Sequence, residues 1–357
     1  MVKIPNITGL RFFLALCVVL FHTSEFCSKH AIPFYNDLSI FNKGHEAVCV
    51  FFSLSGFLII RQLYIEKATF QTISLKNFYL RRALRIFPLY FLVLFYGLAH
   101  YHLILPTFGY EGDYNTNYNL WEGIALSIFF MPNVFASIYH PGGIIEILWS
   151  IGVEEQFYLI IAPLLLLFPL KNYIRFLLVF TITAFVIYHF LEHNFLAKFG
   201  ILFFYFTSSG VISILLFERK IIFNRKVVNY ILLSLFVAYF TTDFFVSYFS
   251  SATYNFISML LFALVIGSLS CKSYELLNNK TITYFGKISY GIYMFHAIVI
   301  QIIGLTYTKL FSGMELNSFL IIVFYNLIVI VVTITVSHFS YQYFEKFFMK
   351  FYPKTPY

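Results

Sequence analysis

Ten long apolar windows limit what this chain can fold into. Each holds about 20 residues that are almost all apolar, the length that a helix needs to cross the hydrocarbon core of a bilayer. The composition agrees, since 60% of the 357 residues are hydrophobic and 11% are charged, against roughly 25% charged residues in soluble domains. We therefore predict an all-α, polytopic membrane protein with about ten transmembrane helices. The windows lie near residues 6–25, 46–65, 84–104, 148–169, 172–191, 198–217, 227–246, 252–270, 286–307 and 317–341.

The basic residues predict the orientation of these spans. A weaker apolar stretch at 120–135 contains Glu122, Pro132 and Asn133. If it does not span and the N-terminus is cytoplasmic, 20 of the 24 Lys and Arg fall in cytoplasmic segments. If it spanned, every later loop would invert and this bias would be lost. We therefore predict that both termini are cytoplasmic and that residues 105–147 form a long outer segment. The outer loops then keep Lys29, Lys43, Lys198 and Lys309.

The remaining global features narrow the class of protein. The net charge of +8 does not indicate nucleic-acid binding, because the Lys and Arg lie in short loops, where they orient a membrane protein. The four cysteines show no metal-ligand spacing. A Cys27–Cys49 disulfide is one alternative, and the other is that both are small apolar core residues. The chain shows no repeat, linker or soluble segment, so we predict one membrane domain over residues 1–357.

The first apolar window carries two ionisable residues, Arg11 and His22. It resembles a signal peptide, but no cleavage site follows it, and a disposable leader would not need these residues. Eleven residues make about three helical turns, so both side chains share one face about 16 Å apart along the axis. Arg11 alone could be a snorkelling anchor, and His22 alone could be a helix-packing residue. Their alignment favours a functional role for both, because ionisable residues within spans are costly.

Three arginines lie in the loop that is predicted to enter the third span. Arg81, Arg82 and Arg85 lie one and four positions apart, and Pro88 follows them. Guanidinium groups bind phosphate oxygens in bidentate fashion. The alternative is orientation charge in contact with lipid head groups.

The fourth window contains two adjacent carboxylates, Glu154 and Glu155. They fall about 9 Å inside the predicted outer boundary, at a depth similar to that of His22. Buried carboxylates without partners cost several kcal/mol. A carboxylate beside an imidazole fixes its tautomer and suits it to act as a general base.

Weaker signals accompany these clusters. Small residues at Ser53, Ser55 and Gly56 allow close helix approach, and packing is the favoured interpretation for them. The ninth window places Tyr293 and His296 within the membrane. Phosphate-binding loops, nucleophile elbows and zinc-protease motifs are all missing from the sequence, and we expect no metal.

Five motifs occur in the order seen in the acyltransferase-3 family, which the chain resembles over nearly its whole length. These enzymes of bacterial inner membranes, and of some eukaryotic membranes, O-acylate lipopolysaccharide, capsule, peptidoglycan and related glycans. The motifs are Arg11-x10-His22, FF-x-LSGF at 51–57, RR-x-x-RI-x-P-x-Y at 81–90, WS-x-x-VEE-x-FY at 149–158 and SYGIYMFH at 289–296.

The resemblance implies roles for these residues. Arg11, Arg81, Arg82 and Arg85 would hold the phosphates of acetyl-CoA or another acyl-CoA at the cytoplasmic face, and His22 would be the essential catalytic residue. Many members end the last motif with Glu-x-Pro, whereas this chain has Glu345-Lys346-Phe347. Many also carry an appended hydrolase-like domain. This chain stops at Tyr357 without one, so it resembles the standalone type.

The predicted mechanism is direct transfer. His22, assisted by Glu154 or Glu155, would deprotonate a hydroxyl that attacks the thioester, and Ser55 or Tyr293 would stabilise the oxyanion. Ser53 and His296 are further candidates for contacts with substrate or oxyanion, and a covalent acyl relay stays open.

The expected acceptor is an O-antigen, capsule or exopolysaccharide unit of a bacterial cell surface, reached from the inner membrane and in contact with membrane lipid. A homodimer is left open. The alternatives are a transporter or flippase of a glycan or lipid, with charges lining its pathway, and a structural subunit without chemistry.

Overall fold

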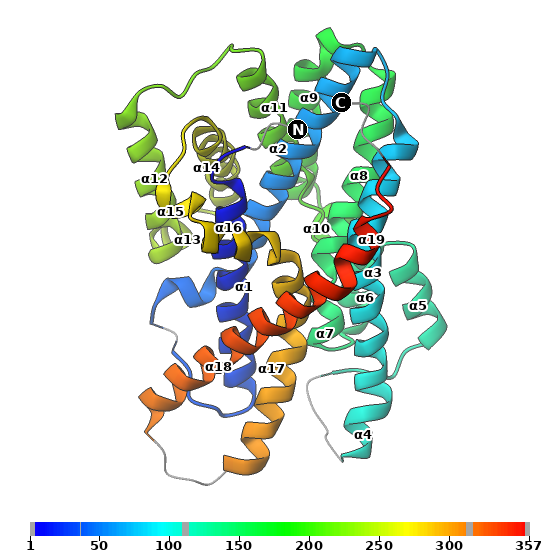
Figure 1. Cartoon of the computed structure of the whole chain (residues 1–357), viewed down its shortest axis with the longest axis vertical. Coiled ribbons are helices and arrows are strands. Elements are labelled where there is room, and N and C mark those ends of the chain that lie inside the picture. Colours follow the sequence, from blue (N-terminus) through cyan, green and yellow to red (C-terminus); the bar gives the residue numbers. More distant parts are fainter. Residues whose placement is uncertain (1–3, 36, 109–113, 312–316, 354–357) are drawn as a thin grey trace. The chain divides into compact units, whose positions relative to one another are not determined.

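The structure is a computed structural model that describes residues 4–35, 37–108, 114–311 and 317–353. Every regular element within these ranges is a helix (Figure 1). The prediction of an all-α polytopic membrane protein is therefore confirmed. Lys3 and Lys354, which contribute to the charge pattern, lie outside the described residues.

Eight helical segments among the described residues are long and apolar enough to cross a bilayer. Two further apolar helices, α11 (Phe203–Phe217) and α12 (Lys226–Thr241), have 15 and 16 residues and fall in two of the predicted windows. The count of ten spans and the cytoplasmic termini stay predictions. The eight segments are α1 (Ile7–Lys29), α2 (Gly44–Phe70), α3–η2–α4 (Leu75–Thr107), α7–α8 (Gly143–Leu167), η3–α9 (Leu170–Phe190), α14 (Ser251–Cys271), α17 (Ser289–Phe311) and α18–η4–α19 (Ser318–Met349).

The weak apolar stretch at 120–135 forms two short helices, α5 (Leu120–Ile128) and α6 (Pro132–Tyr139). Asn119 caps α5 by accepting from the Trp121 and Glu122 amides, and a proline opens α6, where its missing N–H costs no helical bond. Helices of nine and eight residues are about 12–14 Å long, less than half of the hydrocarbon core of about 30 Å. Neither helix is long enough to cross a bilayer, which agrees with the prediction that this stretch does not span.

The described residues form two compact units, each assembled from separate stretches of the chain. The first unit contains the residues up to Leu14, His45–Leu75 and Val153–Gly286. The second unit contains Ala15–Gly44, Lys76–Gly152 and the residues from Lys287 onward. The prediction of a single domain stays a prediction.

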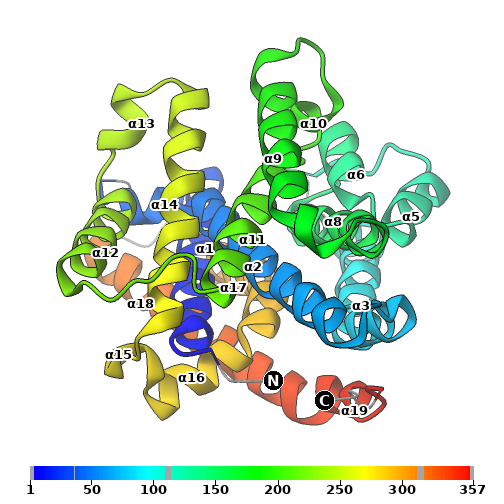
Figure 2. The same cartoon turned by 90° about the horizontal axis from the view of Figure 1, so that it is seen from above.

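In the first unit, α11 packs against both α9 (Tyr173–Phe190) and α14, and α12 packs against α14 (Figure 2). Glycines allow the closest approaches. A Cβ atom on Gly56 of α2 would lie 2.0 Å from the Phe206 carbonyl oxygen of α11. Side chains larger than hydrogen therefore cannot fit between these two backbones without a shift. The unit also contains the short helices α10 (Phe195–Lys198), α13 (Phe244–Tyr248) and α15 (Glu275–Asn278), and all of α16 (Lys280–Lys287) except its last residue.

In the second unit, α18 (Ser318–Phe339) crosses α17 and packs against it (Figure 1), and α17 also contacts α7 (Gly143–Glu146). A Cβ on Gly97 of α3 would lie 2.8 Å from the Ile145 side chain, and one on Gly304 of α17 would lie 2.0 Å from the Phe26 ring of α1. These contacts bring the ends of α1 and α3 to the beginning of α7–α8 and to α17. Between those four elements lies the candidate site.

Candidate functional site

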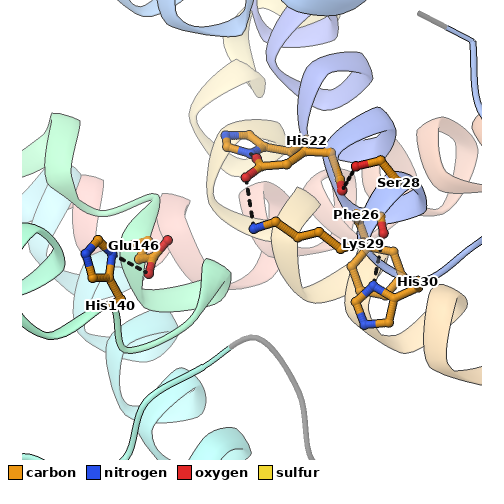
Figure 3. Close-up of polar contacts among 8 residues, drawn as sticks. His22, Phe26, Ser28, Lys29, His30, His140 and Glu146 are labelled. Carbon is orange, nitrogen blue, oxygen red and sulfur yellow. Dashed lines mark hydrogen bonds and ion pairs between the residues drawn. The ribbon is translucent and has the colours of Figure 1, made fainter.

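The second unit contains a cavity of about 600 Å³, within the range of about 300–1,000 Å³ that is typical of small-molecule sites. It is lined by the end of α1, the end of the α3 segment, residues 114–149 and the middle of α17. His22 and Lys29 on α1 face His140 and Glu146 across it (Figure 3). The polar and aromatic lining residues that matter for chemistry are His22, Glu25, Lys29, His30, Tyr101, Tyr114, His140, Glu146 and Trp149.

A histidine–carboxylate pair lies at the α1 side of the cavity. The Nδ1 atom of His22 is 3.1 Å from Oε2 of Glu25, one helical turn away, and Lys29 Nζ is 3.2 Å from Oε1 of the same carboxylate. A carboxylate only accepts hydrogen bonds, so the pairing places the imidazole proton on Nδ1. Nε2 of neutral His22 then carries the lone pair that a general base needs. The helix spacing alone makes Glu25 a neighbour of His22.

His296 on α17 lies beside the catalytic candidate. Its ring centroid is 5.1 Å from that of His22, and its side chain is wholly buried. Nδ1 of His296 donates to the Tyr293 carbonyl at 2.5 Å. Nε2, left with the lone pair, makes no hydrogen bond within the part of the chain that the structure describes. The prediction that His296 contacts substrate stays a prediction.

Tyr293 joins α17 to the beginning of α8 (Trp149–Leu167). Its hydroxyl donates to the Ile147 carbonyl at 2.9 Å and lies 2.7 Å from the Ser150 hydroxyl. A phenol carries one proton, and here the Ile147 carbonyl accepts it. The predicted role of Tyr293 as an oxyanion donor would require this bond to open.

The three predicted arginines lie inside α3 (Leu75–Ala99), which continues through Pro88, and not in a loop before it. Nη1 of Arg81 is buried and has no hydrogen-bond partner among the described residues. Arg82 lies over the Phe78 ring at 6.0 Å. A buried guanidinium N–H that still has no acceptor fits an anionic ligand such as a phosphate.

The C-terminal segment lies beside these arginines. A π-helical turn, η4 (Ser340–Glu345), ends at Glu345, which is buried, accepts from the Ser340 hydroxyl at 3.2 Å and interacts electrostatically with Arg85. Burial raises the pKa of Tyr352, against the opposing effect of Arg85 and Arg82. The departure from Glu-x-Pro therefore leaves a glutamate near the arginines.

The other predicted site residues belong to the first unit. Glu154 accepts from the Ser55 hydroxyl at 2.5 Å and from the Tyr158 hydroxyl. Glu155 and Ser53 are buried, and Arg11 lies on the part of α1 assigned to this unit. Assistance of His22 by Glu154 or Glu155 stays a prediction. The carboxylate that the structure pairs with His22 is Glu25, which the sequence interpretation missed.

The structure adds two observations on metals and thiols. Groups of three or more His, Cys, Asp or Glu side chains that could hold a metal ion do not occur within the described ranges. All four cysteines are free thiols, and Cys17, Cys27 and Cys49 are buried. The interpretation of Cys27 and Cys49 as small apolar residues agrees with this burial.

Comparison with known proteins identifies relatives. The sequence profile of the acyltransferase-3 family, described as an acyltransferase domain, matches residues 4–338. The chain is 25% identical over 315 residues to a protein of Acidianus two-tailed virus that is provisionally named an acetyltransferase, and the match covers 84% of each chain.

Two bacterial relatives match over a shorter region. The chain is 30% identical over 173 residues to the peptidoglycan O-acetyltransferase OatA of Listeria monocytogenes, covering 46% of this chain and 24% of OatA. It is 28% identical over 172 residues to the acyltransferase MdmB of Streptomyces mycarofaciens, covering 44% of this chain and 38% of MdmB. The match therefore spans less than half of each bacterial relative. No solved structure matches the chain.

Proposed function

This chain belongs to the acyltransferase-3 family, and from that premise we propose that it transfers an acetyl or other acyl group from acyl-CoA to a hydroxyl of a glycan. It is a multi-pass membrane O-acyltransferase, as the family and its acetyltransferase relatives show. The observation that carries the proposal is the His22–Glu25 pair at the wall of a cavity of about 600 Å³.

The chemistry follows from this pair. Nε2 of His22 takes the proton from the acceptor hydroxyl as its oxygen attacks the thioester carbonyl carbon. Glu25, hydrogen-bonded to Nδ1, holds the imidazole in the correct tautomer and stabilises the imidazolium that forms. When the carbon–sulfur bond breaks, His22 returns the proton to the departing thiolate. The products are the O-acyl ester and free CoA, and His22 is neutral again.

The arginines of α3 support the choice of acyl-CoA as donor. CoA carries phosphates, and Arg81 offers a buried guanidinium nitrogen without a hydrogen-bond partner in the described part of the chain. Arg82 and Arg85 extend the positive charge along the same helix. A role of Arg11 in binding a CoA phosphate stays a prediction from the sequence, in which Arg11 lies on the same helix as His22, about 16 Å away along the axis.

We assign the enzyme to a bacterial inner membrane, where it would face a lipid-linked or surface glycan such as an O-antigen, capsule or exopolysaccharide unit. The bacterial acetyltransferase relatives and the predicted distribution of Lys and Arg support this location. OatA is named a peptidoglycan O-acetyltransferase, which gives peptidoglycan as the acceptor of that relative.

The test uses the purified full-length protein in lipid nanodiscs with labelled acetyl-CoA and a glycan acceptor. We expect wild-type protein to form acetyl ester, and His22→Ala to lower kcat/KM by roughly 10²–10⁴-fold, the usual contribution of a positioned general base. His193→Ala, an exposed histidine of the first unit, is the matched control and should keep wild-type activity. Wild-type turnover by His22→Ala would overturn the mechanism.

A further inference from the structure

A second histidine–carboxylate pair lines the cavity opposite the first. His140 Nδ1 is 3.8 Å from Oε1 of Glu146, and their side chains are 76% and 38% exposed. Figure 3 shows this pair facing Lys29 and His22 on α1. The proposed acyl transfer uses His22 and Glu25 only, so it leaves Glu146 and His140 without a role.

The backbone that carries Glu146 is held in place by several contacts. The Ile144 amide donates to the hydroxyl of Tyr101 at 3.0 Å, and the Asn115 amide donates to the His140 carbonyl at 3.0 Å. Gly142 has a φ of +108°, and a Cβ there would lie 2.4 Å from the Tyr101 ring. His140 itself adopts a left-handed conformation, with φ of +48°. Strained and tightly seated backbone of this kind persists where the surrounding structure fixes it.

Charge distinguishes the two sides of the cavity. On the α1 side, the carboxylate of Glu25 is occupied by His22 and Lys29 at 3.1 and 3.2 Å. On the other side, His140 stands at 3.8 Å from Glu146, beyond hydrogen-bonding distance. The Gly142 backbone also contacts the Glu146 carboxylate, and the lone pairs that this contact leaves can accept hydrogen bonds from a ligand in the cavity. With its histidines neutral, the lining carries one net negative charge, from Glu25, Lys29 and Glu146.

Such a wall favours one chemical class of acceptor. A carboxylate accepts hydrogen bonds and donates none, so it complements the hydroxyl groups of a sugar and repels a second carboxylate or a phosphate. Trp149 and Tyr101 add aromatic surface to the same cavity, which can pack against the apolar face of a sugar ring. The cavity volume suits a mono- or disaccharide.

We propose that Glu146, with His140 beside it, selects the acceptor, and that the unit acylated is an uncharged sugar whose neighbouring hydroxyls donate to Glu146. This inference rests on the proposed acyltransferase function. Glu146 is a specificity-determining residue here, and His22 remains the catalytic residue.

The experiment compares two acceptors that differ only in charge, a methyl hexoside and the matching methyl hexuronoside, with acetyl-CoA and nanodisc-embedded full-length protein. We expect wild-type kcat/KM to be at least about tenfold higher for the neutral glycoside, because like charges brought together cost several kcal/mol. Glu146→Gln should reduce that ratio about tenfold, through a lowered KM for the hexuronoside, which is no longer repelled, together with a raised KM for the hexoside. His140→Ala should move the ratio in the same direction by less.

Two measurements distinguish a change in acceptor specificity from a general loss of folding or activity. The KM of Glu146→Gln for acetyl-CoA should stay within about twofold of wild type, and its kcat with the hexoside should fall less than its KM rises. Glu192→Gln, an exposed carboxylate of the first unit, is the matched control and should keep the wild-type ratio.

The outcomes distinguish the two proposals. Three outcomes would overturn only the proposed selection by Glu146 and would leave the proposed acyltransferase function standing. They are an unchanged ratio in Glu146→Gln, a wild-type preference for the hexuronoside, and consumption of acetyl-CoA without acylation of either glycoside. Absence of any acetyl-CoA consumption by wild-type protein would overturn the proposed function and this inference with it.

Discussion

Two glutamates near the predicted motifs have very different surroundings. Glu25 in the second unit is 42% exposed, lines a cavity and contacts an imidazole and an ammonium group. Glu154 in the first unit accepts from two hydroxyls, Ser55 and Tyr158. A carboxylate bound to an imidazole N–H sets the tautomer of a base, whereas one bound by hydroxyls satisfies its own lone pairs. The comparison indicates that the first arrangement serves proton transfer and the second stabilises the charge of a half-buried carboxylate.

Neutralising each carboxylate sharpens this comparison and has the largest expected effect. We expect Glu25→Gln to lower kcat by roughly 10²-fold or more, because an amide can hold the wrong imidazole tautomer. Glu154→Gln should cost less than about tenfold in kcat, with its main effect on stability. Steady-state acetylation rates in nanodiscs measure both. A larger loss in Glu154→Gln than in Glu25→Gln would reverse the assignment and restore the sequence-based pairing with His22.

The two units also differ in how tightly their glycines are packed, and we expect substitutions there to have a smaller effect than those at the carboxylates. Gly56→Ala in the first unit would place a methyl group 2.0 Å from the Phe206 carbonyl oxygen, and overpacking of this kind costs about 1–3 kcal/mol or more. We expect a lower midpoint of thermal unfolding in detergent and less folded protein in the membrane. Gly143→Ala in the second unit is the matched control, because a Cβ there meets no atom within 4 Å. Equal stability of both variants would contradict the proposed close contact of α2 with α11.

A third carboxylate, Glu218, is expected to show the smallest effect. Lys220 and Tyr64 lower the pKa of Glu218, against a smaller opposing effect of burial. A lowered folded-state pKa means that the stabilisation is present above the ordinary pKa of 4.5 and is lost as the pH falls through the folded value. When the pH is lowered below about 4.5, the midpoint temperature of unfolding should therefore decrease slightly more for wild-type protein than for Glu218→Gln. Parallel pH profiles would show that the contacts of Glu218 add no stability.

Much of the fold could be predicted from the sequence, because spanning helices depend on local apolar length. The helices fall at the predicted windows, and the interruption of 120–135 follows from Pro132. The partner of His22 was missed although it lies on the same helix. Glu25 is the last residue of the predicted window at 6–25 and lies three positions after His22 on α1, a spacing that makes the two side chains neighbours on a helix.

The rest of the site depends on contacts between distant segments, which local patterns do not reveal. Glu146 and His140 reach the cavity only because Gly142 can adopt a positive φ against the ring of Tyr101. Glu345 approaches Arg85 through a π-helical turn, which shifts the register of the last span by a residue. Neither the left-handed turn nor the π-helix has a strong sequence signature.

The long third segment fixes the distance between two parts of the second unit. Arg81 and Tyr101 belong to one continuous helical stretch, Leu75–Thr107, and twenty residues of helix measure about 30 Å. The number of residues between Arg81 and Tyr101 therefore sets the distance from the arginines to the backbone that carries Glu146. Inserting one residue between them would advance Tyr101 by about 1.5 Å and rotate it by about 100°, so this stretch should tolerate substitution far better than any change in length.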